Sequence, residues 1–264
     1  MWLISYDIRH DLAIKNGVNI DLIIVCNNYL MGNILDIFFP KACTVCSKHG
    51  EYLCSRCKKL FKRNLPECYI CRKLSADYQT HDLCKKENSL DSVVVLWKYE
   101  EITSKILKKY KYGLVYDLES TFEEFVKEGL SEVRGIKREE KSLVVPTPIS
   151  LMRLRDRGFN QSDVFAKAVS EYTGIDYNNT LLKRVDSDST HQSLLDKEER
   201  ILHSTNFEVQ DKKLLDTLSE IIIVDDVITT GKTLEDICKC IREVNKDVKV
   251  RAICLFRGRP YYIK

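Results

Sequence analysis

Short apolar runs alternate with segments of helical periodicity from about residue 91 onward. Four runs predict buried strands at 92–97, 142–146, 221–226 and 250–256, and two periodic segments predict helices at 161–173 and 233–244. The first of these helices should bury Val164, Phe165, Ala168, Val169 and Tyr172 on one face. Apolar strands that alternate with helices are typical of a parallel α/β sheet, which is therefore the predicted fold class.

Composition sets wide bounds on the molecule. With 264 residues, 44% of them hydrophobic, the chain is long enough for one large or two smaller domains, and intrinsic disorder is excluded. The net charge is +3 and indicates no particular partner. No apolar run approaches the roughly 18 residues of a membrane span, and the N-terminus lacks a signal-peptide pattern. We therefore expect a cytoplasmic protein with no membrane span.

Cysteine is concentrated in one segment. Of eleven cysteines, seven lie between Cys43 and Cys84, whereas Cys238, Cys240 and Cys254 fall in the predicted helix and strand and should pack in the core. Clustering at metal-ligand spacing favours zinc over disulfides in a reducing compartment. The same segment is basic, with 11 Lys and Arg against 4 Asp and Glu in residues 41–86.

Four X-x-x-X pairs follow one another in this segment. Such spacing lets a tight turn direct two ligands at one tetrahedral ion, so four pairs predict two closed, structural zinc sites. Sequential pairing and interleaved pairing of the four are both compatible with the sequence. The eight predicted ligands are Cys43, Cys46, Cys54, Cys57, Cys68, Cys71, His81 and Cys84.

The segment IIIVDDVITTGKT (221–233) carries the clearest chemistry. It is not a P-loop, because Asp226 stands where that motif needs its first glycine, and a carboxylate there would repel phosphates. Instead, a buried strand delivers Asp225 and Asp226 to its carboxyl end, and a short loop then opens a helix. Hydroxyls and free amides at a helix N-terminus suit one phosphate, and nearby carboxylates suit sugar hydroxyls. This pattern predicts a ribose 5-phosphate site.

The same segment resembles the PRPP (5-phosphoribosyl-1-pyrophosphate) motif of type I phosphoribosyltransferases. Other segments are similar to those of the ComF family of phosphoribosyltransferase-like proteins linked to DNA uptake. They are KYKYG (109–113), VVPTPISLMRLRDRGFNQ (144–161), THQSLLDKEER (190–200) and the four cysteine pairs, which resemble the family's double zinc ribbon. The family usually has Cys at the position of His81. The resemblance implies an N-terminal arm at 1–40, a zinc ribbon at 41–88 and a phosphoribosyltransferase-like domain at 89–264.

The resemblance also implies ligands and site residues. PRPP would bind with Mg²⁺, Asp225 and Asp226 would be catalytic, and either Lys109 or Lys111 would occupy the pyrophosphate position. Arg153, Arg155 and Arg157 form a cationic cluster that suits pyrophosphate or a nucleic-acid backbone. The full predicted PRPP-binding set is Lys111, Arg155, Arg157, Asp225, Asp226, Thr229, Thr230, Gly231, Lys232 and Thr233.

Two functions remain open at this point. The chain either transfers or recognises a phosphoribosyl group, or it handles single-stranded DNA in natural competence, with PRPP as a regulator. The second function implies a competence helicase or DNA-processing proteins as partners. Tyr52, Phe61 and Tyr69 lie among the basic residues of the ribbon, where they either stack bases or form its small core. PRPP-dependent pyrophosphate release and salt-dependent single-strand binding would separate the two functions.

Overall fold

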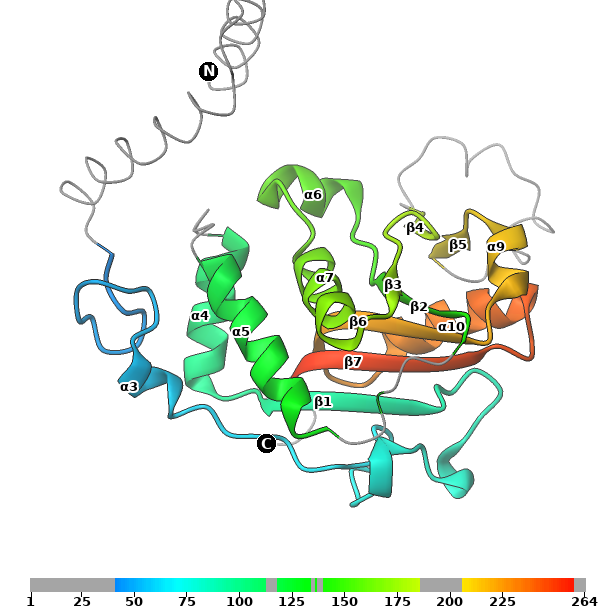
Figure 1. Cartoon of the computed structure of the whole chain (residues 1–264), viewed down its shortest axis with the longest axis horizontal. Coiled ribbons are helices and arrows are strands. Elements are labelled where there is room, and N and C mark those ends of the chain that lie inside the picture. Colours follow the sequence, from blue (N-terminus) through cyan, green and yellow to red (C-terminus); the bar gives the residue numbers. More distant parts are fainter. Residues whose placement is uncertain (1–40, 113–117, 134–135, 137–139, 186–205, 259–264) are drawn as a thin grey trace, which may run out of the picture. The chain divides into compact units, whose positions relative to one another are not determined.

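The structure is a computed structural model that describes residues 41–112, 118–133, 136, 140–185 and 206–258 (Figure 1). The predicted arm 1–40 and the segment 190–200 lie outside these residues. The chain divides into two units, Met1–Cys54 and Ser55–Lys264. The division falls inside the cysteine-rich segment, and the predicted boundary near residue 88 stays a prediction.

The described part of the first unit is a tight turn around the first cysteine pair. Ala42 and His49 form an antiparallel bridge, and the amide of Cys43 donates to the carbonyl of Lys48 at 2.8 Å. Gly50 takes a φ of 115°, a left-handed conformation that suits glycine. The backbone therefore turns sharply enough to bring the first pair back toward the second.

The second unit is built on a five-stranded parallel sheet in the order β1-β7-β6-β2-β3. The predicted parallel α/β fold is confirmed, and the four predicted strands are β1, β2, β6 and β7. The sheet strands are β1 Ser92–Lys98, β2 Ser142–Pro146, β3 Asp176–Tyr177, β6 Glu220–Ile228 and β7 Lys249–Arg257, and a separate antiparallel hairpin pairs β4 Leu182–Arg184 with β5 Phe207–Val209.

Helices cover both faces of the sheet (Figure 1). Helices α5 and α7 pack on one face and α10 on the other, and the predicted helices correspond to α7 and α10. The α-helices are α3 Ser55–Lys58, α4 Glu101–Tyr112, α5 Leu118–Ser131, α6 Leu151–Arg157, α7 Gln161–Thr173, α9 Lys212–Thr217 and α10 Lys232–Val244, and the 3-10 turns are η1 Ala76–Tyr78 and η2 Asp82–Cys84. In the described part of the chain, no helix combines the length and apolarity that a bilayer crossing needs.

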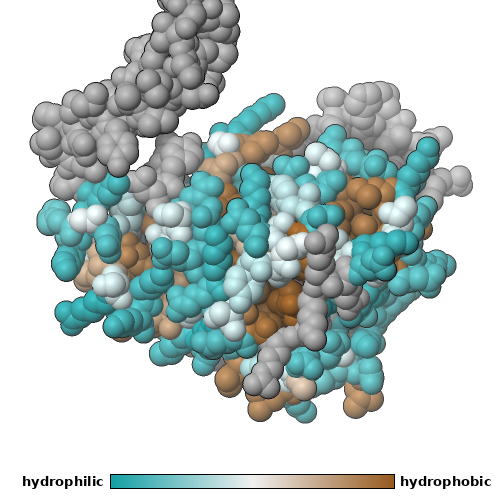
Figure 2. Space-filling model, in the orientation of Figure 1, coloured by the Kyte–Doolittle hydropathy of each residue, from teal (hydrophilic) through white to brown (hydrophobic). Residues whose placement is uncertain are grey.

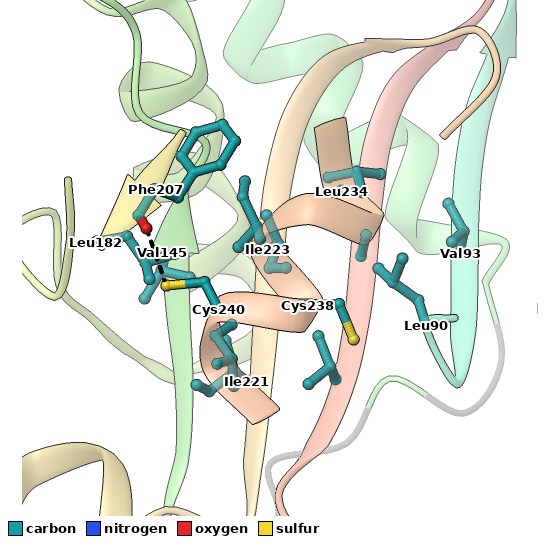
Figure 3. Close-up of a cluster of buried hydrophobic side chains, with 14 of the residues drawn as sticks. Leu90, Val93, Val145, Leu182, Phe207, Ile221, Ile223, Leu234, Cys238 and Cys240 are labelled. Atoms are coloured by element: carbon teal, nitrogen blue, oxygen red, sulfur yellow. Dashed lines mark hydrogen bonds between the residues drawn. The ribbon is translucent and has the colours of Figure 1, made fainter. Parts of the chain in front are cut away.

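Alternate residues of the central strands face opposite helices. Ile221 and Ile223 of β6 belong to the buried cluster that holds Leu234 and Cys238 of α10 (Figure 3). Cys240 also points into this cluster, and its thiol donates to the carbonyl of Phe207 at 3.3 Å. The downstream cysteines are thus core residues, as predicted. A strand that is buried on both faces must be apolar throughout, which explains the continuous runs in the sequence.

Aromatic side chains fill the opposite face. The Phe122 ring of α5 lies with its centroid 5.5 Å from that of Phe165 in α7 and 6.5 Å from that of Phe256 in β7. Of the five residues predicted to be buried on α7, four are buried, but Tyr172 is 46% exposed, so that prediction was wrong. Tyr172 lies in the last turn of α7, two residues before the Gly174 cap.

The edge of the sheet at β1 is covered by the cysteine-rich segment. Asn64 donates to the carbonyl of Leu96, the amide of Lys98 donates to Lys62, and the amide of Thr80 donates to Asp91. Isolated antiparallel bridges join Arg63 to Trp97 and Gln79 to Ser92. Residues 62–92 therefore use backbone groups of an edge strand that would otherwise be open to other chains.

Candidate functional site

The candidate site begins where β2 leaves the sheet. Strand pairing between β2 and β6 stops at Pro146 and Val224, after which the amide of Thr147 makes one further hydrogen bond to the carbonyl of Val224 at 2.8 Å. Strand β6 runs on to Ile228 while paired only with β7. Asp225 and Asp226 therefore lie within the strand and not at its end, a correction to the sequence-based expectation. Their backbone borders the gap that β2 leaves.

This gap coincides with a reversal in the sheet topology. The chain leaves β2 toward β3 on one side, and it leaves β6 toward β7 on the other. In open parallel sheets, ligands bind outside the carboxyl ends of the strands at such a switch point. The carboxylate pair of β6 is thus placed where this fold has its natural crevice.

Asp225 is held by polar neighbours from two elements. Ser162, at the start of α7, donates to its Oδ1 at 3.2 Å, and the amide of Asp226 donates to the same oxygen at 2.9 Å. Burial raises the pKa of Asp225 to about 7, and the negative charge of Asp226 adds to this rise, while Lys111 and the two hydrogen bonds oppose it. A carboxyl group of this pKa changes its charge near neutral pH.

Asp226 forms an ion pair with Lys111 of α4. Both side chains are mostly buried, with 15% and 18% of their surface exposed. The structure therefore brings together the predicted carboxylates and Lys111. Lys109, the other lysine that the resemblance left open, has interactions of its own.

The segment that follows β6 opens α10 through a sharp bend, here called the β6–α10 turn (residues 229–233). Gly231 caps the helix with a φ of 89°, a left-handed conformation that favours glycine. The hydroxyl of Thr230 accepts from the amide of Lys232 at 3.3 Å, and the ammonium of Lys232 pairs with Asp236. Thr229, Thr230, Lys232 and Thr233 are exposed.

A pocket lies over this turn. It holds about 230 Å³ of space not filled by atoms, and it is lined by Asp225 and by every residue from Val227 to Leu234. Amides at the start of a helix carry a partial positive charge and have no intrahelical acceptor. A small anion can therefore bind at this pocket with a carboxylate beside it.

The predicted arginines lie on α6. Arg153 and Arg155 are exposed, whereas Arg157 is only 9% exposed and donates from Nη1 to Oε1 of Gln161 at 2.8 Å. The three do not form one exposed cationic cluster, because Arg157 turns inward at the Gly158 cap. Exposed apolar side chains, those of Leu151, Met152 and Leu154, share this helix, and apolar surface is visible over it in Figure 2.

Eight metal-ligand side chains form two groups. Within each group, the candidate ligand atoms all lie within 4.8 Å of one another, so each can hold a metal ion. The groups follow the sequential pairing, not the interleaved one. The first cluster is Cys43, Cys46, Cys54 and Cys57, and the second cluster is Cys68, Cys71, His81 and Cys84.

His81 is arranged as a ligand in the second cluster. Its Nδ1 lies 3.3 Å from the sulfur of Cys71, and its Nε2 lies 3.2 Å from the carbonyl oxygen of Leu74. A proton on Nε2 donates to that carbonyl, which leaves the lone pair of Nδ1 for a metal. Histidine thus replaces the usual cysteine without loss of a ligand atom.

Two aromatic residues of the cysteine-rich segment are buried. Tyr69 is 1% exposed and Phe61 is 9% exposed, so neither ring is open to stack on a base. Both are core residues, but they do not form a separate core of the ribbon as the sequence suggested. Phe61 packs against Phe125, and Tyr69 belongs to the buried cluster that holds Leu234. Tyr52 is half-buried.

Three residues beside the site were missed by sequence reasoning. Ser162 contacts Asp225, the ring of Tyr69 faces Gly231, and Arg72 donates to the carbonyl of Thr229. Ser162 carries a weak signal, since Asn160 precedes it as a helix cap and places it in the first turn of α7. Tyr69 and Arg72 carry none, because only the tertiary fold brings residues so far apart in sequence together.

Comparison with known proteins agrees with this site. The phosphoribosyl transferase domain family matches residues 165–264, which include the β6–α10 turn. The fold and the turn thus define a phosphoribosyltransferase-like domain. Competence protein F of Haemophilus influenzae is 29% identical over 219 residues, covering 78% of this chain and 93% of that protein. Competence protein ComFC of Streptococcus pneumoniae is 30% identical over 202 residues, covering 75% and 84%.

Among solved structures, a glutamine phosphoribosylpyrophosphate amidotransferase from B. subtilis aligns at a TM-score of 0.39 and 18% identity, covering 55% of this chain and 30% of that one. The identity and coverage to the curated relatives decide the classification. The chain belongs to the ComF family.

Proposed function

We propose that this chain binds PRPP with Mg²⁺ at the β6–α10 turn and transfers or recognises its phosphoribosyl group. The observation that carries the proposal is the pocket over that turn, where the amino end of α10 and the carboxylate of Asp225 face one small space. A phosphate at the helix end and a diol at the carboxylate are the two ends of a ribose 5-phosphate. The match to the phosphoribosyl transferase domain supports the same ligand.

Each part of the site has a separate task in this proposal. Exposed hydroxyls of Thr229, Thr230 and Thr233, with the amides of the turn, bind the 5-phosphate. Asp225 and Asp226 accept from the ribose hydroxyls and offset the positive charge that develops on the sugar as the bond to pyrophosphate weakens. Lys111 neutralises Asp226 in the free protein and is near enough to bind pyrophosphate oxygens instead once ligand arrives.

The carboxylate pair also fits a bound magnesium ion. Mg²⁺ prefers oxygen ligands, and in phosphate sites it is typically held by one or two carboxylates together with substrate phosphates. Asp225 and Asp226 supply such oxygens, and the ion would supply charge stabilisation for the leaving pyrophosphate. A pKa of about 7 at Asp225 suits a group that becomes ionised when a cation approaches.

Calorimetric titration tests the assignment. The double substitution Asp225→Asn with Asp226→Asn keeps the side-chain size and removes both charges. It should weaken Mg²⁺-PRPP binding by the free energy of a hydrogen bond to a charged group, about 1.5–3 kcal/mol. Thr230→Val should weaken the binding of ribose 5-phosphate and of PRPP to the same extent. The binding of free pyrophosphate should not change. A double Asn variant that binds PRPP as tightly as the parent would show that the carboxylates are wrongly assigned. A screen of nucleobases for pyrophosphate release then decides between transfer and recognition.

We further propose that both cysteine clusters bind zinc structurally. Tetrahedral zinc with Zn–S bonds of about 2.3 Å places its sulfurs about 3.8 Å apart. The sulfurs of Cys46 and Cys54 lie 3.7 Å apart, which fits that geometry. Burial alone would raise the pKa of Cys43, but backbone amides of Cys54 and Cys46 lower it to about 6, which favours the thiolate that a metal needs. Reduced thiols in such number support a cytoplasmic protein.

A role in DNA uptake is the second candidate. The names of the two relatives, Competence protein F and Competence protein ComFC, support it. Arg153 and Arg155 are exposed on α6 and can contact a phosphate backbone. If they do, the affinity for single-stranded DNA should fall steeply with salt, and replacing both with Ala should reduce that slope by about 1.4, at about 0.7 for each lost phosphate contact. An unchanged slope would remove α6 from any DNA-binding surface.

A further inference from the structure

The second cysteine cluster lies directly against the β6–α10 turn. Tyr69, between the ligands Cys68 and Cys71, places its ring beside Gly231. A Cβ on Gly231 would lie 2.8 Å from Cε2 and 3.0 Å from Cδ2 of that ring, closer than carbon atoms normally approach. Glycine is thus required here for its left-handed φ and also for the space that Tyr69 occupies.

Arg72, the residue after Cys71, holds the other side of the turn. Its Nη2 donates to the carbonyl of Thr229 at 3.2 Å and to the carbonyl of Gly258 at 3.3 Å. The amide of Gly258 donates in turn to the carbonyl of Ile228 at 2.8 Å. One guanidinium therefore ties the start of the turn to the end of β7, and the position of Arg72 is set by the cysteine beside it.

Tyr69 is fixed by three hydrogen bonds of its own. Its hydroxyl donates to Oε1 of Glu235 in α10 at 2.9 Å and accepts from the amide of Leu90 at 3.3 Å. Its carbonyl accepts from Nη2 of Arg257 at 2.7 Å, and Arg257 pairs with Glu67 at a nitrogen–oxygen separation of 2.9 Å. Arg257 is 7% exposed, so this pair lies in a region where such contacts are poorly screened.

We infer that the second cluster positions the phosphate-binding turn: a metal bound by Cys68, Cys71, His81 and Cys84 fixes Tyr69 and Arg72, and these two residues hold residues 229–231 in the conformation that binds a phosphate. Metal occupancy at the second cluster and affinity for a 5-phosphate are then coupled. This inference rests on the proposed function for its ligand, but its structural half, the ordering of the turn by the cluster, stands without it.

The first cluster provides the comparison that the test needs. Its last ligand, Cys57, lies in α3, next to Lys58, which pairs with Glu124 of α5. Phe61, four residues after Cys57, packs against Phe125 with ring centroids 4.6 Å apart. These contacts lead to α5 and not to the β6–α10 turn, so loss of Cys57 should cost stability without changing phosphate affinity.

The experiment uses the full chain and five variants, of which Arg72→Lys is the conservative change at the turn contact. Cys71→Ser removes a ligand of the second cluster, and Cys57→Ser is the matched change at the first. Arg72→Ala keeps all ligands and removes the contacts to the turn, and Lys73→Ala removes the same charge from an exposed neighbour. Each protein is titrated with ribose 5-phosphate and with Mg²⁺-PRPP, and amide hydrogen exchange is followed at residues 229–235.

Cys71→Ser and Arg72→Ala should each bind both phosphates at least tenfold more weakly than the parent, and their amides at 229–235 should exchange at least tenfold faster. Arg72→Lys should recover only part of this, since one ammonium cannot reproduce the planar guanidinium. Cys57→Ser and Lys73→Ala should match the parent in affinity and in exchange of this segment. If Cys71→Ser proves unfolded, Arg72→Ala carries the decision.

Two failures can be told apart. If the parent binds neither phosphate, the proposed function fails, and the exchange rates of residues 229–235 still decide whether the cluster orders the turn. If the parent binds PRPP but Arg72→Ala binds it equally well with parental exchange rates, the inference is overturned while the proposed function stands. Equal loss in Cys57→Ser and Cys71→Ser would also overturn it, since the coupling would then be general unfolding.

Discussion

The two cysteine clusters share their ligand spacing and compactness but differ in what surrounds them. Near the first cluster, Lys58 and Phe61 contact α5. Within the second, Tyr69 and Arg72 contact the β6–α10 turn. Two groups of similar candidate ligands thus lie beside different parts of the fold. The difference between the clusters therefore lies in the residues beside the ligands and not in the ligands themselves.

The largest expected effect concerns both clusters together. The purified protein should hold two zinc ions per chain. Removing them should lower the free energy of unfolding of this segment by on the order of 10 kcal/mol, so that the segment unfolds. Elemental analysis gives the metal content, and circular dichroism after chelation follows the unfolding. His81→Ala should lower occupancy at one site only. Full occupancy of both sites in that variant would exclude His81 as a ligand.

A paired substitution next to the clusters sharpens the comparison. Phe61→Ala and Tyr69→Ala each remove a buried ring, and each should lower the free energy of unfolding by about 3–5 kcal/mol. Only Tyr69→Ala should also weaken PRPP binding, because only Tyr69 supports the turn. Denaturant unfolding and calorimetry below the melting temperature separate the two effects. Weakened binding in Phe61→Ala would contradict the division between the clusters.

Gly231 tests the contact itself. Gly231→Ala should lower the free energy of unfolding by about 1–3 kcal/mol. Part of this loss comes from the left-handed φ and part from overlap with the ring of Tyr69. In a Tyr69→Ala background only the first part remains, so the two changes should be non-additive in a double-mutant cycle. Additive costs would show that the ring and the glycine do not interact in solution.

The difference in pH dependence between the parent and Asp225→Asn should come from the carboxylate pair, since that substitution leaves both cysteine clusters intact. The pKa of Asp225 is about 7 in the folded chain against an ordinary value of 3.8, so the folded state binds more protons between these values. Stability should therefore fall as the pH rises from 4 to 7 and level off above 7. Asp225→Asn should remove this fall. At pH 8 it should raise the free energy of unfolding by roughly 1–2 kcal/mol after solvent screening. The control is Asp211→Asn, at the exposed N-cap of α9.

Thermal unfolding of parent and variant across this pH range checks the sign. A parent whose stability rises from pH 4 to 7 by more than Asp225→Asn does would contradict the raised pKa. The difference between parent and variant should persist in a Cys57→Ser background, because Asp225 is not part of that cluster.

Local patterns in the sequence predicted much of the fold. Strands buried on both faces must be continuously apolar, and α10 must show a one-sided apolar pattern, so both could be located without a structure. The turn at Gly231 and the carboxylates before it were also accessible, because their chemistry lies within a few residues. The end of the strand was misjudged, since only the early departure of β2 at Pro146 shows where the gap opens.

Contacts between distant segments could not be predicted. Tyr69 and Gly231 are separated by most of the domain, and no pattern in either segment points to the other. Arg157 had the charge of a ligand-binding residue, yet the backbone turn at Gly158 directs it inward to Gln161. Burial of a single arginine depends on tertiary packing, which a charge pattern does not record. The PRPP-binding role of Arg155 and Arg157 stays a prediction.

The cover over strand β1 has a practical consequence for producing the protein. A truncated chain that starts near residue 89 would keep the whole sheet, yet it would lose the segment that bonds to Leu96, Lys98 and Asp91. A free edge strand is a template for pairing with other copies. Such a truncation should precipitate or form large assemblies on expression, as light scattering would show, whereas one that starts near residue 41 should remain monodisperse.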